Sequence, residues 1–367
     1  MRDPIATAVR LHDRAVSARD DERHQDAAAL AGRSLRILER EMGPDAPDVA
    51  NVLNTAARIQ QDLGAYTEAE AMFRRSVAIM QNLGGDPDVE RVRVQSFAGL
   101  ADILRIEGRY REAEPHFERA LALAEAAFGP EDTEVSSVLN GWAVLYKYSG
   151  RFDDAERLYR RALGILEKTA GPESSDVATI YHNLGGLEHS RGRYAVGEPY
   201  ARRSVEIREK ACGPDSPETA ADIAALAAIL DAQDKRQEAE QLYQRALNVF
   251  ETRYGQENYE VAVNLNNLAA LHYARGNSLL AEAFYWWALH LKEKLMGPDH
   301  PDTAMTLNNL AVLFKTQGKF DQAEPLFRRA LATFESHLDA DHPRLVTCRE
   351  NFEEMQQERT QEHRPGS

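Results

Sequence analysis

Residues 307 to 331 read LNNLAVLFKTQGKFDQAEPLFRRAL, and this stretch decides how the chain folds. The stretch LNNLAALHYARGNSLLAEAFYWWAL, residues 265 to 289, matches it at an offset of 42 residues. Turn glycines recur at the same spacing in all steps but one; they are Gly64, Gly108, Gly150, Gly192, Gly276 and Gly318, with Asp234 in the place of one more. A fixed period of this length predicts a repeat array, in which each unit buries its apolar face on its neighbours.

Each unit carries two apolar stripes at helical spacing. Leu310 and Phe314 lie on the first stripe, and Ala323 and Phe327 lie on the second. Apolar residues three or four positions apart share one face of a helix. Gly318 stands between the stripes, where a left-handed residue commonly ends a helix. The pattern predicts an all-α fold of antiparallel helix pairs.

Two residue columns and one junction motif point to a known family. Small residues recur at Ala69, Ala113, Ala155, Gly197, Ala239, Ala281 and Ala323, and aromatic residues at Phe73, Phe117, Tyr159, Tyr243, Tyr285 and Phe327. With the LNNLA core and GPDHP junctions, this pattern resembles the tetratricopeptide repeat in the 42-residue form of kinesin light chain and its relatives. The resemblance covers about residues 24–340. It implies a right-handed α-solenoid whose first helices line a concave groove for a peptide or a partner protein.

The repeats divide the chain into four expected segments. Residues 1–42 are expected to form a degenerate N-terminal repeat or cap, and residues 43–338 seven helical repeats. Residues 339–358 are expected to form a C-terminal capping helix, and residues 359–367 a disordered tail.

Composition excludes several classes of function. The formal net charge of −15 argues against a nucleic-acid partner. The sequence holds no run of 18 apolar residues, so no membrane span is expected, and its first residues are too charged for a signal peptide. Cys212 and Cys348 lie several repeats apart and are predicted to be free thiols in a reducing, cytoplasmic setting.

No motif for catalysis is present. The sequence lacks a glycine-rich phosphate loop, an HExxH motif and a GxSxG motif, so neither enzyme activity nor a cofactor is expected. His182 and His189 stand two helical turns apart and share a face. A metal site usually needs three or more convergent ligands, so no metal site is expected.

The candidate binding residues lie on the first helices, away from the packing stripes. Asparagine is a poor helix former, so its repeated use in mid-helix needs a reason. Its amide can both donate and accept, and a row of amides could hold the backbone of an extended peptide. Alternatively, some asparagines bond neighbouring helices or fit tight packing. The predicted groove residues are Asn54, Arg58, Arg105, Asn140, Lys147, His182, Asn183, Ala225, Asn266, Asn267, Tyr273, Asn308, Asn309 and Lys315.

Alanines interrupt the polar row around Ala225. Ala221, Ala224 and Ala228 share its helix face. This apolar floor could form a pocket for a hydrophobic side chain of a ligand, or it could be a closely packed alanine-rich helix. The groove charge is mixed, so a carboxylate-bearing peptide is one possible ligand.

A second anomaly lies on the second helices. Two adjacent positions read Arg74-Arg75, Arg160-Arg161, Arg202-Arg203 and Arg328-Arg329 in four repeats, and Trp286-Trp287 in another. Exposed tryptophans favour an interface. They predict a second contact surface, with self-association as one option and local packing between repeats as the alternative.

Together these features predict a non-catalytic scaffold or adaptor that binds a peptide segment or partner protein in its concave groove. Two alternatives remain open. The chain could be a regulatory or sensor subunit that controls a separate effector through its convex face, or a structural homo-oligomer.

Overall fold

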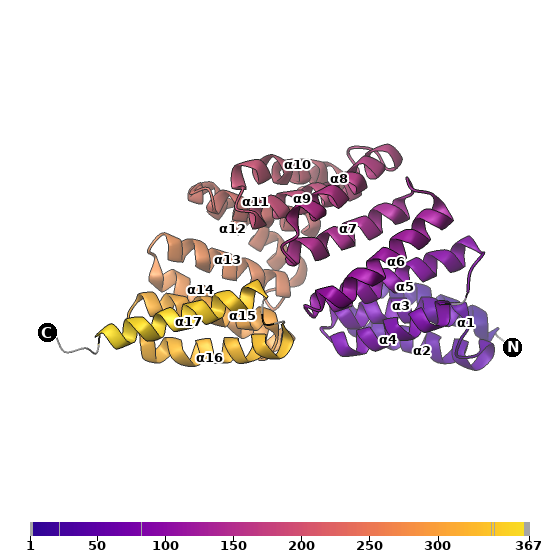
Figure 1. The fold of residues 1–367 in the computed structure, drawn as a ribbon, viewed down its shortest axis with the longest axis horizontal. Helices are drawn as coiled ribbons and strands as arrows, with labels where there is room; N and C mark the ends of the chain where they lie inside the picture. Colours follow the sequence, from indigo (N-terminus) through magenta and orange to yellow (C-terminus); the bar gives the residue numbers. More distant parts are fainter. Residues whose placement is uncertain (1–2, 22, 82, 339, 341, 363–367) are drawn as a thin grey trace. The chain divides into compact units, whose positions relative to one another are not determined.

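The computed structural model describes residues 3–21, 23–81, 83–338, 340 and 342–362, which form seventeen α-helices and no strand (Figure 1). The predicted all-α repeat fold is therefore confirmed. The helices are α1 (Pro4–Asp20), α2 (His24–Met42), α3 (Pro47–Asp62), α4 (Tyr66–Met80), α5 (Pro87–Ile106), α6 (Tyr110–Phe128), α7 (Thr133–Tyr148), α8 (Phe152–Thr169), α9 (Ser175–Ser190), α10 (Tyr194–Cys212), α11 (Pro217–Asp231), α12 (Arg236–Tyr254), α13 (Tyr259–Ala274), α14 (Ser278–Met296), α15 (Pro301–Thr316), α16 (Phe320–His337) and α17 (Pro343–Glu362).

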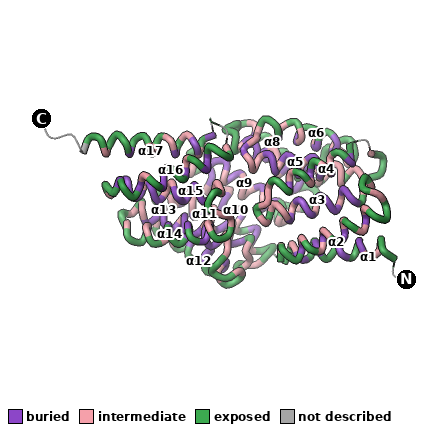
Figure 2. Tube along the Cα trace, turned by 90° about the horizontal axis from the view of Figure 1, so that it is seen from below, coloured by how far each residue is buried: buried purple, intermediate pink, exposed green. Residues whose placement is uncertain are grey.

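The helices group into two compact units, residues 1–169 and residues 170–367. In each unit an odd-numbered first helix packs on the even-numbered second helix that follows it. First helices of consecutive repeats also lie side by side: α1, α3, α5 and α7 in one unit, and α9, α11, α13, α15 and α17 in the other. Buried residues follow the faces where helices meet (Figure 2).

Helix α17 is longer than the sequence indicated. The capping helix was expected to end at 358, before a disordered tail, yet α17 continues to Glu362. Arg359 forms ion pairs with Asp321 and Glu324 of α16, at 2.8 and 2.7 Å. These contacts hold the last turns of α17 against the preceding repeat. The rest of the expected tail, residues 363–367, lies outside the described residues.

Aromatic rings of the second helices set the distance between repeats. Phe73 of α4 is fully buried, and its ring lies against Gly99 of α5. A Cβ added at Gly99 would stand 2.2 Å from Cε1 of Phe73. One repeat later the ring of Phe117 faces Gly141 in the same way, with a corresponding distance of 2.9 Å. Glycine is therefore required opposite the rings of Phe73 and Phe117.

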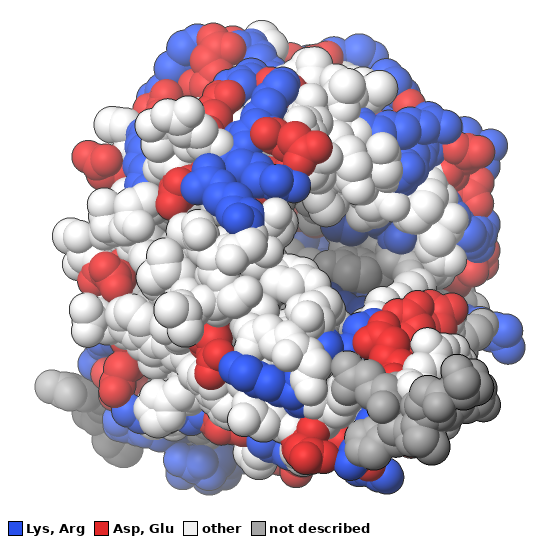
Figure 3. All heavy atoms as spheres, turned by 90° about the vertical axis from the view of Figure 1, so that its left-hand side faces the viewer, with Lys and Arg blue, Asp and Glu red and all other residues white. Residues whose placement is uncertain are grey.

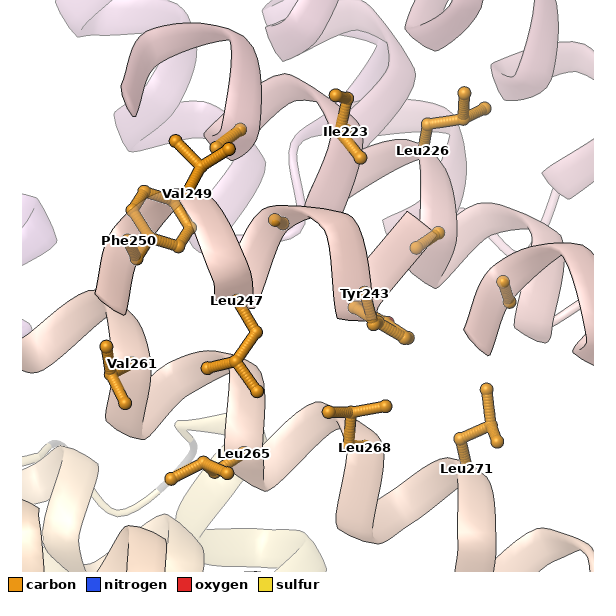
Figure 4. Close-up of a cluster of buried hydrophobic side chains, with 14 of the residues drawn as sticks. Ile223, Leu226, Tyr243, Leu247, Val249, Phe250, Val261, Leu265, Leu268 and Leu271 are labelled. Atoms are coloured by element: carbon orange, nitrogen blue, oxygen red, sulfur yellow. The ribbon is translucent and has the colours of Figure 1, made fainter. Parts of the chain in front are cut away.

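In the second unit, apolar side chains of α11, α12 and α13 form most of one core cluster (Figure 4). Tyr243, Leu247 and Phe250 of α12 are buried between α11 and α13. Ile223 and Leu226 come from α11, and α13 contributes Val261, Leu265, Leu268 and Leu271. Burying one such side chain contributes about 1.5–3 kcal/mol, so the repeat stack is held mainly by apolar contact.

The turn positions confirm the register deduced from the glycines. Asp234 stands where the other repeats have glycine, and it has a φ of 60°. Gly276 and Gly318, one and two repeats later, have φ values of 77° and 69°. Asp234 thus adopts the left-handed conformation that the turn requires, which aspartate tolerates better than most residues.

Arginines on the second helices link consecutive repeats. Four repeats contain the same ion pair between an arginine and a glutamate 36 residues earlier: Arg75–Glu39, Arg161–Glu125, Arg245–Glu209 and Arg329–Glu293. Three of these arginines also donate to the carbonyl of the junction proline, namely Pro44, Pro130 and Pro214. We call this recurring contact the arginine link.

The ring-to-glycine contact can be tested with two alanine substitutions. Gly99→Ala should lower the free energy of unfolding by about 1–3 kcal/mol or more, because its Cβ would overlap the ring of Phe73. Gly164→Ala is the matched control, because it lies inside α8 with no neighbouring atom within 4 Å of an added Cβ. It should raise stability by about 0.5–1 kcal/mol. Urea unfolding measures both, and equal effects would contradict the proposed role of Gly99.

Candidate functional site on the first helices

The predicted asparagines form bonds between neighbouring first helices. Asn309 Nδ2 of α15 lies 3.4 Å from Asn266 Oδ1 of α13, to which it donates. One repeat later, Asn351 Nδ2 of α17 donates to Asn308 Oδ1 at 3.2 Å. The two bonds join equivalent positions. Part of the reason for mid-helix asparagine is therefore this seam between repeats, the alternative that the sequence left open.

Asn54 is the most buried of the predicted groove asparagines. It is 2% exposed, and its Nδ2 donates to the carbonyl of Val92 and to Ser96 Oγ of α5, at 3.2 and 3.0 Å. Ser96 Oγ also contacts Ser76 Oγ of α4 at 2.8 Å. Asn54 thus bonds within the protein and is too buried to hold a ligand backbone.

Asn267 differs from its neighbours. It is half-buried, and it makes no hydrogen bond or ion pair with any residue in the part of the chain that the structure describes. Asn266, directly before it, is 6% exposed and accepts from both Thr306 and Asn309. Asn140 and Asn183 are half-buried and already engaged with other groups. Within the row, the side-chain amide of Asn267 is therefore uncommitted.

His182 belongs to a polar cluster that joins three helices. Its Nδ1 lies 2.8 Å from Asp222 Oδ1 of α11, and the Asp222 side chain is 3% exposed. Asp222 also accepts from Arg208 Nε of α10 at 3.1 Å. Arg208 in turn donates to Ser175 and Thr179 of α9. The cluster places His182 on the first-helix face, with Nδ1 beside the Asp222 carboxylate.

His182 and His189 do not gather further ligands. Among the described residues, no group of three or more His, Cys, Asp or Glu side chains is placed to hold a metal ion. The ring of His189 instead contacts that of Tyr194 at a tilt of 57°, with centroids 5.2 Å apart.

The alanines of α11 contribute to the core as well as to the groove face. Ala221, Ala224 and Ala228 are half-buried and pack against the cluster shown in Figure 4. Ala225 is also half-buried and stands where other repeats carry glycine or asparagine. The packing is compatible with both interpretations of this alanine-rich surface, a pocket for an apolar side chain or a closely packed helix.

The first unit contains a hollow on its first-helix face. It has a volume of about 450 Å³ and is lined by residues of α1, α3, α5 and α7. The lining residues are Val16, Arg19, Thr55, Arg58, Gln95, Thr133, Glu134 and Ser137. Arg58 was among the predicted groove residues, and the structure places it in the wall of this hollow.

Arg58 is the unpaired cation of this hollow. It forms no hydrogen bond or ion pair with a described residue, although burial lowers the pKa of its guanidinium. Nearby carboxylates are already paired: Asp62 with Arg19 at 2.5 Å, Asp102 with Arg105 at 3.3 Å and Glu134 with Arg91 at 2.8 Å. A buried charge without a partner is costly, so Arg58 is suited to receive an anionic group.

Three further predicted residues are occupied by protein contacts. Arg105 and Lys147 both approach the ring of Tyr148, with distances of 5.8 and 4.9 Å to its centroid. Lys315 was expected to face an open groove, but it is 9% exposed and pairs with Glu354 of α17 at 2.8 Å. Since α17 covers it, Lys315 is removed from the candidate site. Tyr273 is half-buried against the core of the last repeats.

The two tryptophans of α14 are exposed, as predicted. Trp286 and Trp287 retain 45% and 38% of their accessible surface. The ring of Trp286 lies 6.5 Å from that of Phe314, so one edge is packed locally. On the face shown in Figure 3, Lys and Arg side chains lie next to Asp and Glu in several clusters, with broad areas of uncharged residues between them.

Comparison with known proteins identifies the repeats. The family model described as "Tetratricopeptide repeat" matches residues 7–82, 92–168, 176–252 and 256–336. The chain belongs to the tetratricopeptide-repeat family. The recognition of such repeats in their kinesin-light-chain-like form is thereby confirmed.

Solved structures share the fold. BtubC (BKLC) from P. vanneervenii is 25% identical, with 64% of this chain and 92% of that one covered, at a TM-score of 0.51. A Rap protein in complex with competence and sporulation factor is 13% identical, with coverage of 96% and 99%, at a TM-score of 0.61. RapI in its apo form is 15% identical, with coverage of 78% and 98%, at a TM-score of 0.59. No curated protein matches the sequence.

Two further observations concern the cysteines and the hydropathy of the helices. Cys212 and Cys348 are both free, as predicted. None of the helices in the described ranges has the length and apolar content that crossing a membrane requires.

Two buried cations were missed by the sequence analysis. Arg208 and Lys292 replace apolar residues such as Phe250 and Phe334 at equivalent positions of the second helices. Lys292 is 1% exposed, and its Nζ donates to Thr306 Oγ1 at 3.1 Å and to the carbonyl of Asp302 at 3.3 Å. Burial lowers the pKa of Lys292 to about 8. A charged residue in an apolar column was the signal that could have found both.

The different roles of Asn54 and Asn267 predict different effects of alanine substitution on stability. Asn54→Ala should lower the free energy of unfolding by about 1–3 kcal/mol, because it removes two buried hydrogen bonds to α5. Asn267→Ala should change it by less than about 0.5 kcal/mol, because no described residue loses a partner. Chemical denaturation measures both variants. A larger loss for Asn267→Ala would contradict this assignment.

Lys292 predicts a stability that depends on pH. Its pKa is lowered on folding from 10.5 to about 8, so the unfolded chain binds more protons between these values. The contribution of Lys292 therefore becomes more favourable as the pH rises through this window. The stability of Lys292→Met relative to the unsubstituted chain should fall by about 1–2 kcal/mol from pH 7.5 to 9.5. Lys294→Met, at a half-exposed site, is the control and should show no such trend.

Proposed function

We propose that this tetratricopeptide-repeat chain is a non-catalytic scaffold that binds a peptide segment of a partner protein along its first-helix face. Repeats of this family generally mediate protein–protein interaction. The observation that carries the proposal is Arg58, a largely buried cation without a described partner in the wall of a hollow lined by four first helices.

The chemistry of the hollow favours an acidic segment. Arg19 and Glu134 are each paired with another residue, which leaves Arg58 as the lining charge without a counter-ion. Thr55, Thr133 and Ser137 add hydroxyl groups, and Gln95 adds an amide, all able to bond a peptide backbone. A carboxylate on the peptide would pair with Arg58, where a charge-assisted hydrogen bond is stronger than a neutral one.

The second unit offers a complementary surface for the same kind of ligand. Asn267 supplies an uncommitted amide, and Ala225 supplies a small side chain one repeat earlier on the adjacent first helix. We treat these as candidate contacts for a backbone and an apolar side chain. His182 would be held in one orientation by Asp222 and could present its other nitrogen to the ligand.

Selection of displayed peptides on the immobilised chain tests this function. Selected peptides should be enriched in Asp and Glu, and Arg58→Gln should weaken their binding about tenfold or more, measured by fluorescence anisotropy. Arg157→Gln, at a side chain of α8 that is 78% exposed, is the matched control and should leave affinity unchanged. If Arg58→Gln, Asn267→Ala and Ala225→Phe all leave the affinity of the selected peptides unchanged, binding on the first-helix face is ruled out.

A further inference from the structure

The arginine link is absent from α14, where tryptophan replaces the arginine and leaves a distinct exposed surface. Trp287 stands at the position of Arg245 and Arg329 in the preceding and following repeats. Glu251 stands at the position of their partners, Glu209 and Glu293. Glu251 is half-buried, and its side chain has no ion pair or hydrogen bond with a described residue. The replacement thus leaves this glutamate without its arginine.

The neighbouring position shows the same loss. Four repeats contain an ion pair within the second helix: Arg74–Glu70, Arg160–Glu156, Arg202–Glu198 and Arg328–Glu324. In α14 the arginine is replaced by Trp286, and the glutamate is Glu282. Glu282 retains one ion pair, with Lys319 at 3.7 Å. Two indoles therefore lie beside two carboxylates that have lost the arginine found elsewhere.

The exposed surface of α14 extends beyond the tryptophans. Leu279 and Leu280 are 86% and 49% exposed and lie about two helical turns before the tryptophans, on the same side of α14. The equivalent residues one repeat later are Asp321 and Gln322. An apolar stripe on an otherwise charged outer face costs solubility and gives no packing in return, which is typical of an interaction surface.

We propose that this stripe, formed by Leu279, Leu280, Trp286 and Trp287, binds a basic amphipathic helix of a partner protein. The partner would bury apolar side chains on the indoles and would supply arginine or lysine to Glu251 and Glu282. It would thus provide from another chain the cations that other repeats provide from their own. This surface lies on a second helix and is independent of the proposed peptide site on the first helices.

Charge favours a basic helix over the other occupants, an anionic lipid surface and a second copy of the chain. An anionic lipid surface would be repelled by the two glutamates and by the net charge of −15. A second copy of the same stripe would bring Glu251 and Glu282 of both chains to one interface without adding a cation to it. A helix with cations at its edges satisfies both the apolar and the acidic parts of the surface.

The test uses the full chain with Trp142→Phe, which leaves Trp286 and Trp287 as the remaining indoles of the three tryptophans. The probe is a synthetic amphipathic helix with leucines on one face and arginines at its edges; its counterpart carries glutamates instead. The basic peptide should shift tryptophan emission to shorter wavelength, because the indoles become buried, and the acidic counterpart should not. Equal binding of the two peptides would overturn the proposal.

Two double variants separate the contributions. With labelled peptide, Trp286→Arg/Trp287→Arg should abolish binding, and Glu251→Gln/Glu282→Gln should weaken it about tenfold. Glu257→Gln/Glu335→Gln changes the net charge equally at exposed sites and should leave affinity unchanged, as should Arg58→Gln. If the two glutamine pairs weaken binding equally, the attraction is non-specific and the proposal fails.

Measurements of stability and of mass in solution distinguish the proposal from local packing and from self-association. Trp286→Arg/Trp287→Arg should be at least as stable as the unsubstituted chain, because it restores both arginine contacts. A marked loss of stability would show that the indoles serve local packing. Light scattering should give a monomer for the chain alone; a dimer that the double variant converts to a monomer would assign the stripe to self-association.

Discussion

The contact between an aromatic ring and the next first helix is the constraint on which each unit depends. A solenoid repeat cannot bury its apolar face alone, so its stability rests on the fit to its neighbour. Phe73 and Phe117 show how close this fit is, since each ring occupies the volume that a Cβ would need at Gly99 or Gly141. Alanines next to these rings let the helices approach, and the 42-residue period keeps ring and recess in register.

Once that spacing is set, the polar residues of the first helices fall into two groups. Those that face the seam bond one another, as Asn309 does with Asn266, and are part of the architecture. Those whose side chains have no partner among the described residues, such as Arg58 and Asn267, remain available on the first-helix face. The same repeat position therefore serves structure in one repeat and stays open in another. Asn309 bonds Asn266, whereas Asn267, at the equivalent position, has Ala224 in place of that acceptor in the preceding repeat.

The outer face follows a similar logic. Arginine links repeat along it and satisfy the junction carbonyls, yet each exposed ion pair contributes only about 0–1 kcal/mol. The tryptophans of α14 can therefore replace them at small cost in stability. This tolerance explains how a repeat array can alter one surface without disturbing its core, which is built from the opposite face of the same helix.

The sequence by itself determined the fold class, the repeat register and the exposed position of Trp286 and Trp287, because periodic small and aromatic residues leave one way to bury them. It also marked Asp234 as a turn residue, which its φ of 60° confirms. The sequence could not separate Asn266 from Asn267, or show that α17 covers Lys315 and that Arg58 lacks a partner. Those outcomes depend on which side chains of separate repeats meet, at distances of a few ångströms. Only the tertiary structure decided them, because a repeat period specifies which face a residue occupies but not which neighbour satisfies its charge or its hydrogen bonds.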